Sequence, residues 1–179
     1  MKGQTERLHR EFEDIARRGA ELVTSLDDEA LVRRPSEQGW SAGECIQHLS
    51  ITAEEYVRRV RRVLDGAVRT ADARDESLTF IGRMMVRVAE PPAGRIKIKT
   101  PSPEFLPGEL QTRDELLARF QRSHAAMVAI IAESDAYDRR RLKVASPGSD
   151  RMKLPLVDTF SLLAAHARRH LWQAARAAR

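Results

Sequence analysis

Cysteine, aromatic residues and long apolar runs are all scarce in this chain of 179 residues, and each scarcity excludes a class of protein. The single cysteine, Cys45, excludes an intramolecular disulfide framework. No apolar run approaches the roughly 18 to 20 residues that a membrane span needs. The N-terminal segment is charged throughout and lacks the apolar core of a secretory signal. We therefore expect a cytoplasmic protein that does not bind a membrane.

Aromatic residues make up only 5% of the chain, whereas Ala, Arg, Leu and Glu are abundant, and this mixture favours helix over sheet. The length suits a single domain over residues 1–179, which can bury a core without disulfides or a structural metal.

The net charge is +5, from 31 basic and 26 acidic residues, and the two signs are interspersed as on solvated helix faces. Nucleic-acid binding is therefore the less favoured explanation of the basic excess. Its candidates are the arginine clusters Arg58-Arg59, Arg61-Arg62 and Arg139 to Arg141.

Apolar residues recur at spacings of three and four in four long segments, which predicts four amphipathic helices. Two of them begin with capping-box pairs, Ser41 with Glu44 and Thr112 with Glu115. The sequence therefore predicts an all-α fold, an antiparallel four-helix bundle, with a less regular all-α domain as the alternative. The predicted helices cover residues 4–25, 41–66, 112–134 and 155–177, the last with Pro155 as its first residue.

The segments between these helices differ in kind. Residues 27–35 and 135–153 look like polar connectors. Residues of about 70–111 form a long crossover between the second and third bundle helices, with a shorter helix near 78–88. Several prolines then surround a small alternating piece at 95–99. A connection of this length is usually either functional or loosely ordered.

Two of the five histidines, His166 and His170, are four residues apart in the last predicted helix, so their side chains share one face. Such a pair can chelate one metal ion. The spacing alone is weak support, because an ordinary charged face can contain the same pair. The glutamate that follows the first histidine in zinc proteases is absent, since position 167 is alanine.

His48 lies at the edge of the apolar stripe of the second predicted helix, and Cys45 lies one turn earlier. From spacing alone, a core-edge histidine satisfied by a hydrogen bond is the better explanation of His48. Cys45 could serve as a metal ligand, but a small buried core residue is the more common case. His124 sits among apolar neighbours and is interpreted as structural, and His9 lies on an exposed Arg-rich turn with no assigned role.

Three segments carry a resemblance to a known family, in the same order along the chain. Residues 35–49 read PSEQGWSAGECIQHL, residues 99–109 read KTPSPEFLPGE, and residues 166–176 read HARRHLWQAAR. The Trp-Ser pair followed by a helix with His-Leu, the proline-rich crossover and the closing His-x-x-x-His helix resemble the DinB/YfiT-like superfamily, in particular DinB_2-like proteins.

The resemblance implies a four-helix bundle that binds one divalent metal ion through His48, His166 and His170. Zinc, nickel or iron would suit three neutral imidazoles. Trp40 would pack at the end of the bundle, and Gln173 could orient a ligand or be an ordinary surface residue.

Some members of the family use the metal to activate a low-molecular-weight thiol, so the resemblance implies a metal-dependent transferase or hydrolase that acts on a small molecule. The alternatives are a metal-binding or stress-response bundle without turnover and an Arg-rich nucleic-acid-binding protein. No catalytic side chain can be named: Glu44 is explained as a cap, and Asp158 would reach the site only if the last helix began later. The sequence leaves homodimer formation open.

Overall fold

The computed structural model describes residues 3–70, 77–92, 102–146 and 149–179, so the alternating piece at 95–99 lies outside the described residues. The described chain is mainly helical, as the composition predicts, and it includes one small two-stranded sheet. The elements are α1 (Gly3–Ser25), α2 (Asp28–Val32), α3 (Ala42–Asp65), α4 (Phe80–Ala89), η1 (Pro103–Phe105), α5 (Arg113–Ser134), β1 (Lys143–Ser146), β2 (Ser149–Pro155) and α6 (Leu156–Ala177).

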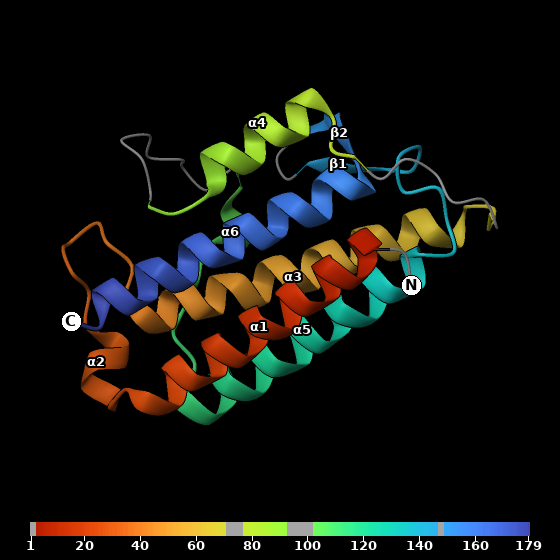
Figure 1. The fold of residues 1–179 in the computed structure, drawn as a ribbon. Coiled ribbons are helices and arrows are strands. Elements are labelled where there is room, and N and C mark those ends of the chain that lie inside the picture. Colours follow the sequence, from red (N-terminus) through yellow and green to blue (C-terminus); the bar gives the residue numbers. More distant parts are fainter. Residues whose placement is uncertain (1–2, 71–76, 93–101, 147–148) are drawn as a thin grey trace.

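The bundle consists of α1, α3, α5 and α6, which are the four helices that the sequence predicts. In the packing, α1 and α3 each contact both α5 and α6, and α1 and α3 lie across the bundle from one another. Figure 1 shows that α1 runs opposite to α5 and α3 runs opposite to α6, whereas α3 and α5 run in the same direction. The long crossover permits this arrangement, because it returns the chain along the bundle before α5 begins.

Both predicted capping boxes are present. The Ser41 hydroxyl accepts the backbone N–H of Glu44 at 3.1 Å, and the Glu44 carboxylate accepts the backbone N–H of Ser41 at 2.8 Å. At α5 the Glu115 carboxylate accepts both the backbone N–H and the hydroxyl of Thr112, at 3.1 and 2.7 Å. These contacts satisfy N–H groups that a helix start leaves without a partner.

Three features of the connectors differ from the sequence prediction. The first connector contains the short helix α2, which Asp27 caps by accepting the backbone N–H of Ala30 at 2.7 Å. The polar connector at 135–153 contains the antiparallel hairpin β1–β2. Pro155 is the N-cap of α6 rather than its first helical residue, because it still belongs to β2. None of these changes the bundle.

The crossover helix α4 packs along α6 and is held by polar contacts (Figure 1). Its N-cap residue, Thr79, donates its backbone N–H and its hydroxyl to the buried carboxylate of Asp158, at 2.9 and 2.5 Å. Gly82 lies so close to Asp158 that an added Cβ would overlap the carboxylate. At the other end, Arg168 of α6 donates to Glu90. Part of the apolar surface of α4 faces outward, and Phe80, Ile81, Met84 and Val88 are exposed.

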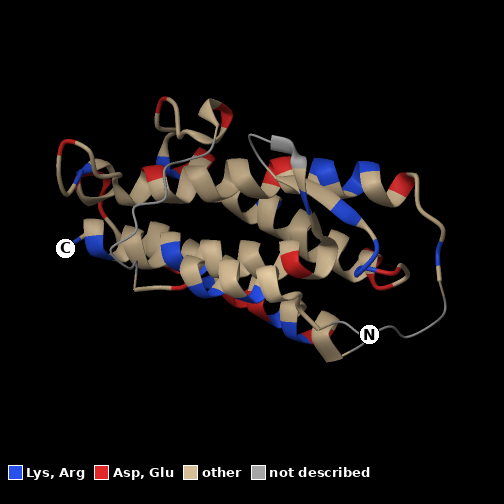
Figure 2. Cartoon of the chain, turned by 90° about the horizontal axis from the view of Figure 1, so that it is seen from above, with Lys and Arg blue, Asp and Glu red and all other residues tan. Residues whose placement is uncertain are grey.

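Along the helices drawn in Figure 2, Lys and Arg of the described residues are interspersed with Asp and Glu. In the two arginine clusters of α3, Arg59 pairs with Glu55 at 2.6 Å and Arg61 pairs with Glu133 at 2.5 Å. Arg139 is buried. No helix among the described residues combines the length and the apolar character that a membrane crossing requires.

Phe120 of α5 fills the centre of the bundle and is fully buried. It packs directly against the backbone of α1 at Gly19, where an added Cβ would overlap the ring. A glycine is therefore needed at this position because it lets two helices approach closely, although glycine lowers helix stability.

We expect Gly19→Ala to destabilise the protein by about 1–3 kcal/mol, because overpacking at Phe120 outweighs the gain in helix propensity. Urea unfolding at neutral pH measures this change. Gly3→Ala is the matched control in the same helix, since nothing lies within 4 Å of its added Cβ. A Gly19→Ala protein more stable than the wild type would contradict this packing.

His124 is a core residue, as its apolar neighbours predict. Its Nδ1 lies 3.0 Å from the Phe120 carbonyl oxygen, and the two rings have centroids 4.0 Å apart. Burial lowers the pKa of His124 to about 4, so the ring is neutral at pH 7.

This burial makes stability depend on pH. Near pH 6.5 the unfolded chain binds a proton at His124, whereas the folded chain does so only near pH 4, so stability falls as the pH is lowered through this window. Within this window, protonation of His124 lowers the free energy of unfolding by about 1.4 kcal/mol for each pH unit. We expect His124→Gln to flatten the pH dependence of the unfolding free energy between pH 7 and 5, because about one proton fewer is taken up on unfolding. Urea unfolding at several pH values measures this slope. Equal slopes in both proteins would refute this assignment.

Candidate metal centre

The fold brings together the three histidines that the resemblance implies. His48 comes from α3, and His166 and His170 come from successive turns of α6, which packs against α3. One ring nitrogen from each lies within 4.8 Å of the others. This set is a candidate metal centre formed by two helices that are far apart in sequence.

The spacing of the ring nitrogens suits a metal ion. The Nε2 atoms of His48 and His166 are 3.2 Å apart. Two nitrogen ligands about 2.0–2.1 Å from a tetrahedral zinc ion would lie about 3.3 Å from each other. The observed separation therefore fits two ligands that share one ion, with the ring of His170 centred 4.5 Å from that of His48.

The crossover orients His48. The Nδ1 of His48 lies 2.6 Å from the backbone carbonyl oxygen of Phe105 in η1, so Nδ1–H is the donor. Nε2 is then left with its lone pair, which is the form a metal ligand requires. This hydrogen bond also confirms the sequence interpretation of His48 as a residue satisfied at the core edge, and it is compatible with a ligand role.

Two residues that the sequence analysis missed hold this carbonyl in place. Phe105 is only 2% exposed, which anchors η1 against the bundle. Gln47 donates to the Glu109 carbonyl oxygen at 2.9 Å and accepts the backbone N–H of Gln111 at 3.1 Å, so it fixes the chain just after η1. A phenylalanine between Pro103 and Pro107 was the available signal, because an apolar residue in a proline-rich loop needs a place to be buried.

Trp40, at the start of α3, forms an aromatic wall beside the histidines. Its ring centroid lies 4.8 Å from that of His48. It lies 5.7 Å from that of His170, with the two rings inclined by 25°. The resemblance placed Trp40 at the end of the bundle, and the structure adds that it packs on two of the candidate ligands.

All three imidazoles are neutral at pH 7. Burial lowers the pKa of His48, although the hydrogen bond to Phe105 acts in the opposite direction. Burial, the neighbouring His48 and the positive charge of Arg169 lower the pKa of His166 to about 3. Burial, followed by the other two histidines and Arg169, lowers the pKa of His170 well below 6.5. Neutral imidazole is the form that binds a divalent metal.

The residues present fit a divalent cation. One ring nitrogen of each histidine lies within 4.8 Å of the other two, and a neutral ring offers a lone pair to a cation at that point. Three convergent nitrogen ligands suit zinc, nickel or iron, and the ligand type does not choose among them.

The other candidate residues lie elsewhere. Cys45 is buried beside Ala42 and Ala174, and burial raises the pKa of its thiol to about 12, which suits a core residue. Glu44 is held by Arg34 as well as by the Ser41 cap. Asp158 holds Thr79, as described above.

Within the described part of the chain, the structure groups no carboxylate or cysteine with the three histidines. Gln173 is half-buried, and none of the hydrogen bonds between described residues joins it to them.

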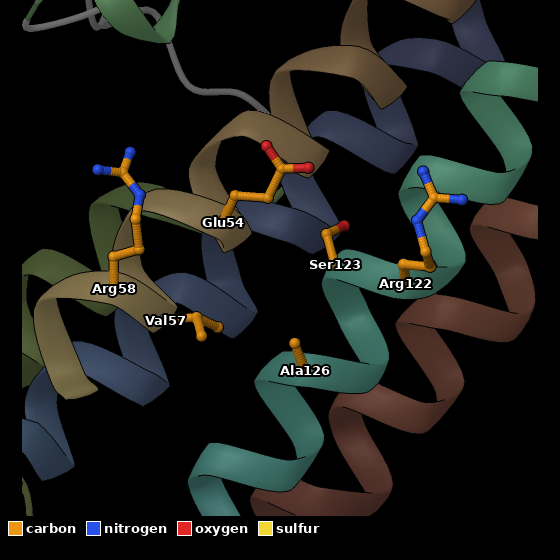
Figure 3. A pocket seen from close by; sticks show the side chains of 6 residues that line it. All are labelled: Glu54, Val57, Arg58, Arg122, Ser123 and Ala126. Atoms are coloured by element: carbon orange, nitrogen blue, oxygen red, sulfur yellow. The ribbon is translucent and has the colours of Figure 1, made fainter.

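A hollow of about 310 Å³ lies on the outside of the bundle between α3 and α5. Figure 3 shows Glu54 and Arg58 of α3 and Arg122 of α5 around it, with the small side chain of Ala126 between the helices. None of the three clustered histidines lines it. We therefore assign it no part in the metal centre.

Comparison with known protein families agrees with the helical fold. The sequence profile of the DinB superfamily matches residues 11–174, a range that includes all four bundle helices in whole or in part and all three histidines. Neither a curated protein nor a solved structure matches the chain. The profile covers most of the sequence, and on this basis the chain belongs to the DinB superfamily.

Proposed function

We propose that this protein is a metal-dependent enzyme that acts on a small molecule. It binds one divalent metal ion through His48, His166 and His170. Transfer of a low-molecular-weight thiol is the favoured reaction, and hydrolysis is the alternative. The observation that carries the proposal is the convergence of three neutral imidazoles, one buried and two partly buried, each with a ring nitrogen within 4.8 Å of those of the other two.

Three protein ligands favour catalysis over a purely structural role. Structural zinc sites are closed by four protein ligands, whereas catalytic sites keep a position for water or substrate. Bound at such a centre, the ion would supply a positive charge that lowers the pKa of a thiol or water beside it. The chain's own part is to hold the three imidazoles neutral and oriented, with Phe105 fixing the tautomer of His48.

The surroundings of the histidines favour a thiol over water as the nucleophile. Glu44 and Asp158 are both occupied by other contacts, so neither is placed to accept a proton from a substrate. A thiol, with a pKa of about 8.5, loses its proton far more readily than water does. A site beside which the described residues place no carboxylate base therefore suits thiol chemistry better than hydrolysis.

The lack of a carboxylate base beside the histidines, among the described residues, also fits a non-catalytic metal-binding bundle, because a protein that only retains metal has no need of a base. The two functions share the site and differ only in turnover.

We expect the untagged protein, incubated separately with zinc, nickel or iron(II) and then dialysed, to retain about one ion per chain with at least one of the three metals. Elemental mass spectrometry measures this ratio. His48→Ala, His166→Ala and His170→Ala should each lose most of the metal while still folded. His9→Ala is the matched control, since His9 pairs with Glu13 on the surface of α1.

Tryptophan fluorescence gives a second measure of binding that needs no dialysis. In a Trp172→Phe background the remaining tryptophan is Trp40, which stacks on His170. Nickel should quench this emission in the protein with intact histidines and leave the His170→Ala protein unchanged. Failure of all three ions to bind, or equal loss of metal in His9→Ala, would refute the metal centre.

We expect the metal-loaded protein to accelerate attack of a low-molecular-weight thiol on an electrophile. In a test with glutathione or a related thiol and 1-chloro-2,4-dinitrobenzene, sulfur forms a bond to the ring carbon, chloride leaves and the thiol proton is released. The rate is followed by absorbance against the His48→Ala/His166→Ala/His170→Ala protein. Full metal occupancy without acceleration across a panel of thiols would favour the non-catalytic bundle.

A further inference from the structure

A small internal cavity lies next to the metal centre, at the middle of the bundle. Its volume is about 10 Å³, and residues of α1, α3, α5 and α6 line it. Most of the lining is apolar, but three polar side chains take part: Thr52 of α3, His124 of α5 and His166 of α6. A cavity of roughly 10–15 Å³ is about the size that one water molecule needs, provided that it offers polar partners.

Two of these side chains each have one polar atom without a hydrogen bond to the described residues. The Oγ1 of Thr52, a residue only 6% exposed, and the Nδ1 of His166 are both buried without a hydrogen bond. Leaving such a group unsatisfied costs about 1–3 kcal/mol. Unsatisfied groups of this kind call for a specific explanation. Because both residues line one small cavity, a single bound water would explain both atoms.

The third side chain offers an acceptor. The Nδ1 of His124 lies 3.0 Å from the Phe120 carbonyl oxygen and therefore carries the hydrogen. Its Nε2 is left with a lone pair in the neutral ring. The three polar residues that line the cavity thus carry a hydroxyl, an imidazole acceptor and the Nδ1 of a candidate metal ligand.

We propose that one water molecule occupies this cavity and bridges the Thr52 hydroxyl, the His124 Nε2 and the His166 Nδ1, so that Thr52 is a positioning residue for the ligand His166. This inference rests on the proposed metal-binding function. It goes beyond that function because it assigns a buried hydration site and a role to a threonine that lies outside the histidine cluster.

The contact between His48 and His166 explains why a hydroxyl and a water suit the position beside the Nδ1 of His166. The Nε2 of His48 has no hydrogen, so the 3.2 Å contact needs Nε2–H of His166 as donor, and the His166 Nδ1 is then an acceptor. When the His166 Nε2 serves as a ligand, its hydrogen moves to Nδ1, which becomes a donor. A hydroxyl and a water can each donate or accept. The Thr52 hydroxyl and the water therefore satisfy the Nδ1 of His166 in both tautomers.

The first test compares zinc affinity by competition with a chromophoric chelator. Thr52→Val keeps the shape of the side chain and removes the hydroxyl, and we expect it to weaken binding by roughly 10- to 100-fold, the usual effect of losing an outer partner of a ligand. Thr52→Ser keeps the hydroxyl and should bind within about threefold of the wild type. Ser50→Ala is the matched control: Ser50 is buried on the same helix, but its hydroxyl donates to the Ile46 carbonyl oxygen.

The second test reads the tautomer of His166 directly, by ¹⁵N NMR of histidine-labelled protein. We expect the Nε2–H form in metal-free protein and the Nδ1–H form after zinc is added. In metal-free Thr52→Val the ¹⁵N shifts of the His166 ring should move, whereas Thr52→Ser should restore them. A crystal structure at high resolution should place one water within hydrogen-bonding distance of Thr52 Oγ1 and His166 Nδ1.

The two proposals fail in different ways. If the wild type binds no metal, the proposed function is refuted, while the metal-free NMR comparison and the water still test the role of Thr52. If the wild type binds zinc and folded Thr52→Val binds it equally well with unchanged His166 shifts, the positioning role is refuted and the metal centre stands. A cavity without the water in the crystal structure would also refute the bridge.

Discussion

The hydrogen bond from His48 Nδ1–H to the Phe105 carbonyl oxygen is the interaction on which the site depends. It joins a bundle helix to the crossover and settles which ring nitrogen of His48 is free. The burial of Phe105 and the two hydrogen bonds of Gln47 fix the carbonyl that receives it. The direction of the contact between His48 and His166, and with it the state of His166 Nδ1, follows from this one donor. The proline-rich crossover is therefore part of the candidate site as well as a connection.

Much of the fold follows from local sequence rules. The periodic apolar stripes identify the four bundle helices, and the pairs Ser41 with Glu44 and Thr112 with Glu115 mark where two of them begin. The candidate ligands also follow, but by two routes. The i, i+4 spacing places His166 and His170 on one face of a helix, whereas His48 joins them only through the family resemblance. No local rule states which face of α3 meets which face of α6.

The remaining features are tertiary, which is why the sequence did not show them. The contacts of Gln47 with 109–111 join residues more than 60 positions apart, and Thr52 matters only because His124 and His166 line the same cavity. The outward apolar face of α4 is a similar case. Its apolar spacing predicts a helix, but the side that meets α6 is the one with Gly82, which lies against the carboxylate of Asp158. The hairpin and α2 are short elements whose polar composition hides them in connectors.

The separation of the candidate ligands along the chain would give a bound metal a mechanical role. His48 and His166 are 118 positions apart, so an ion held by both acts as a reversible cross-link across most of the chain. Closing so long a loop costs conformational entropy in the unfolded chain, whereas in the folded chain the two histidines already lie side by side. Binding selectively to the folded chain adds about 2.7 kcal/mol to stability when the free ion is 100-fold above its Kd. Metal supply would then govern how long the folded protein persists, independently of any reaction it performs.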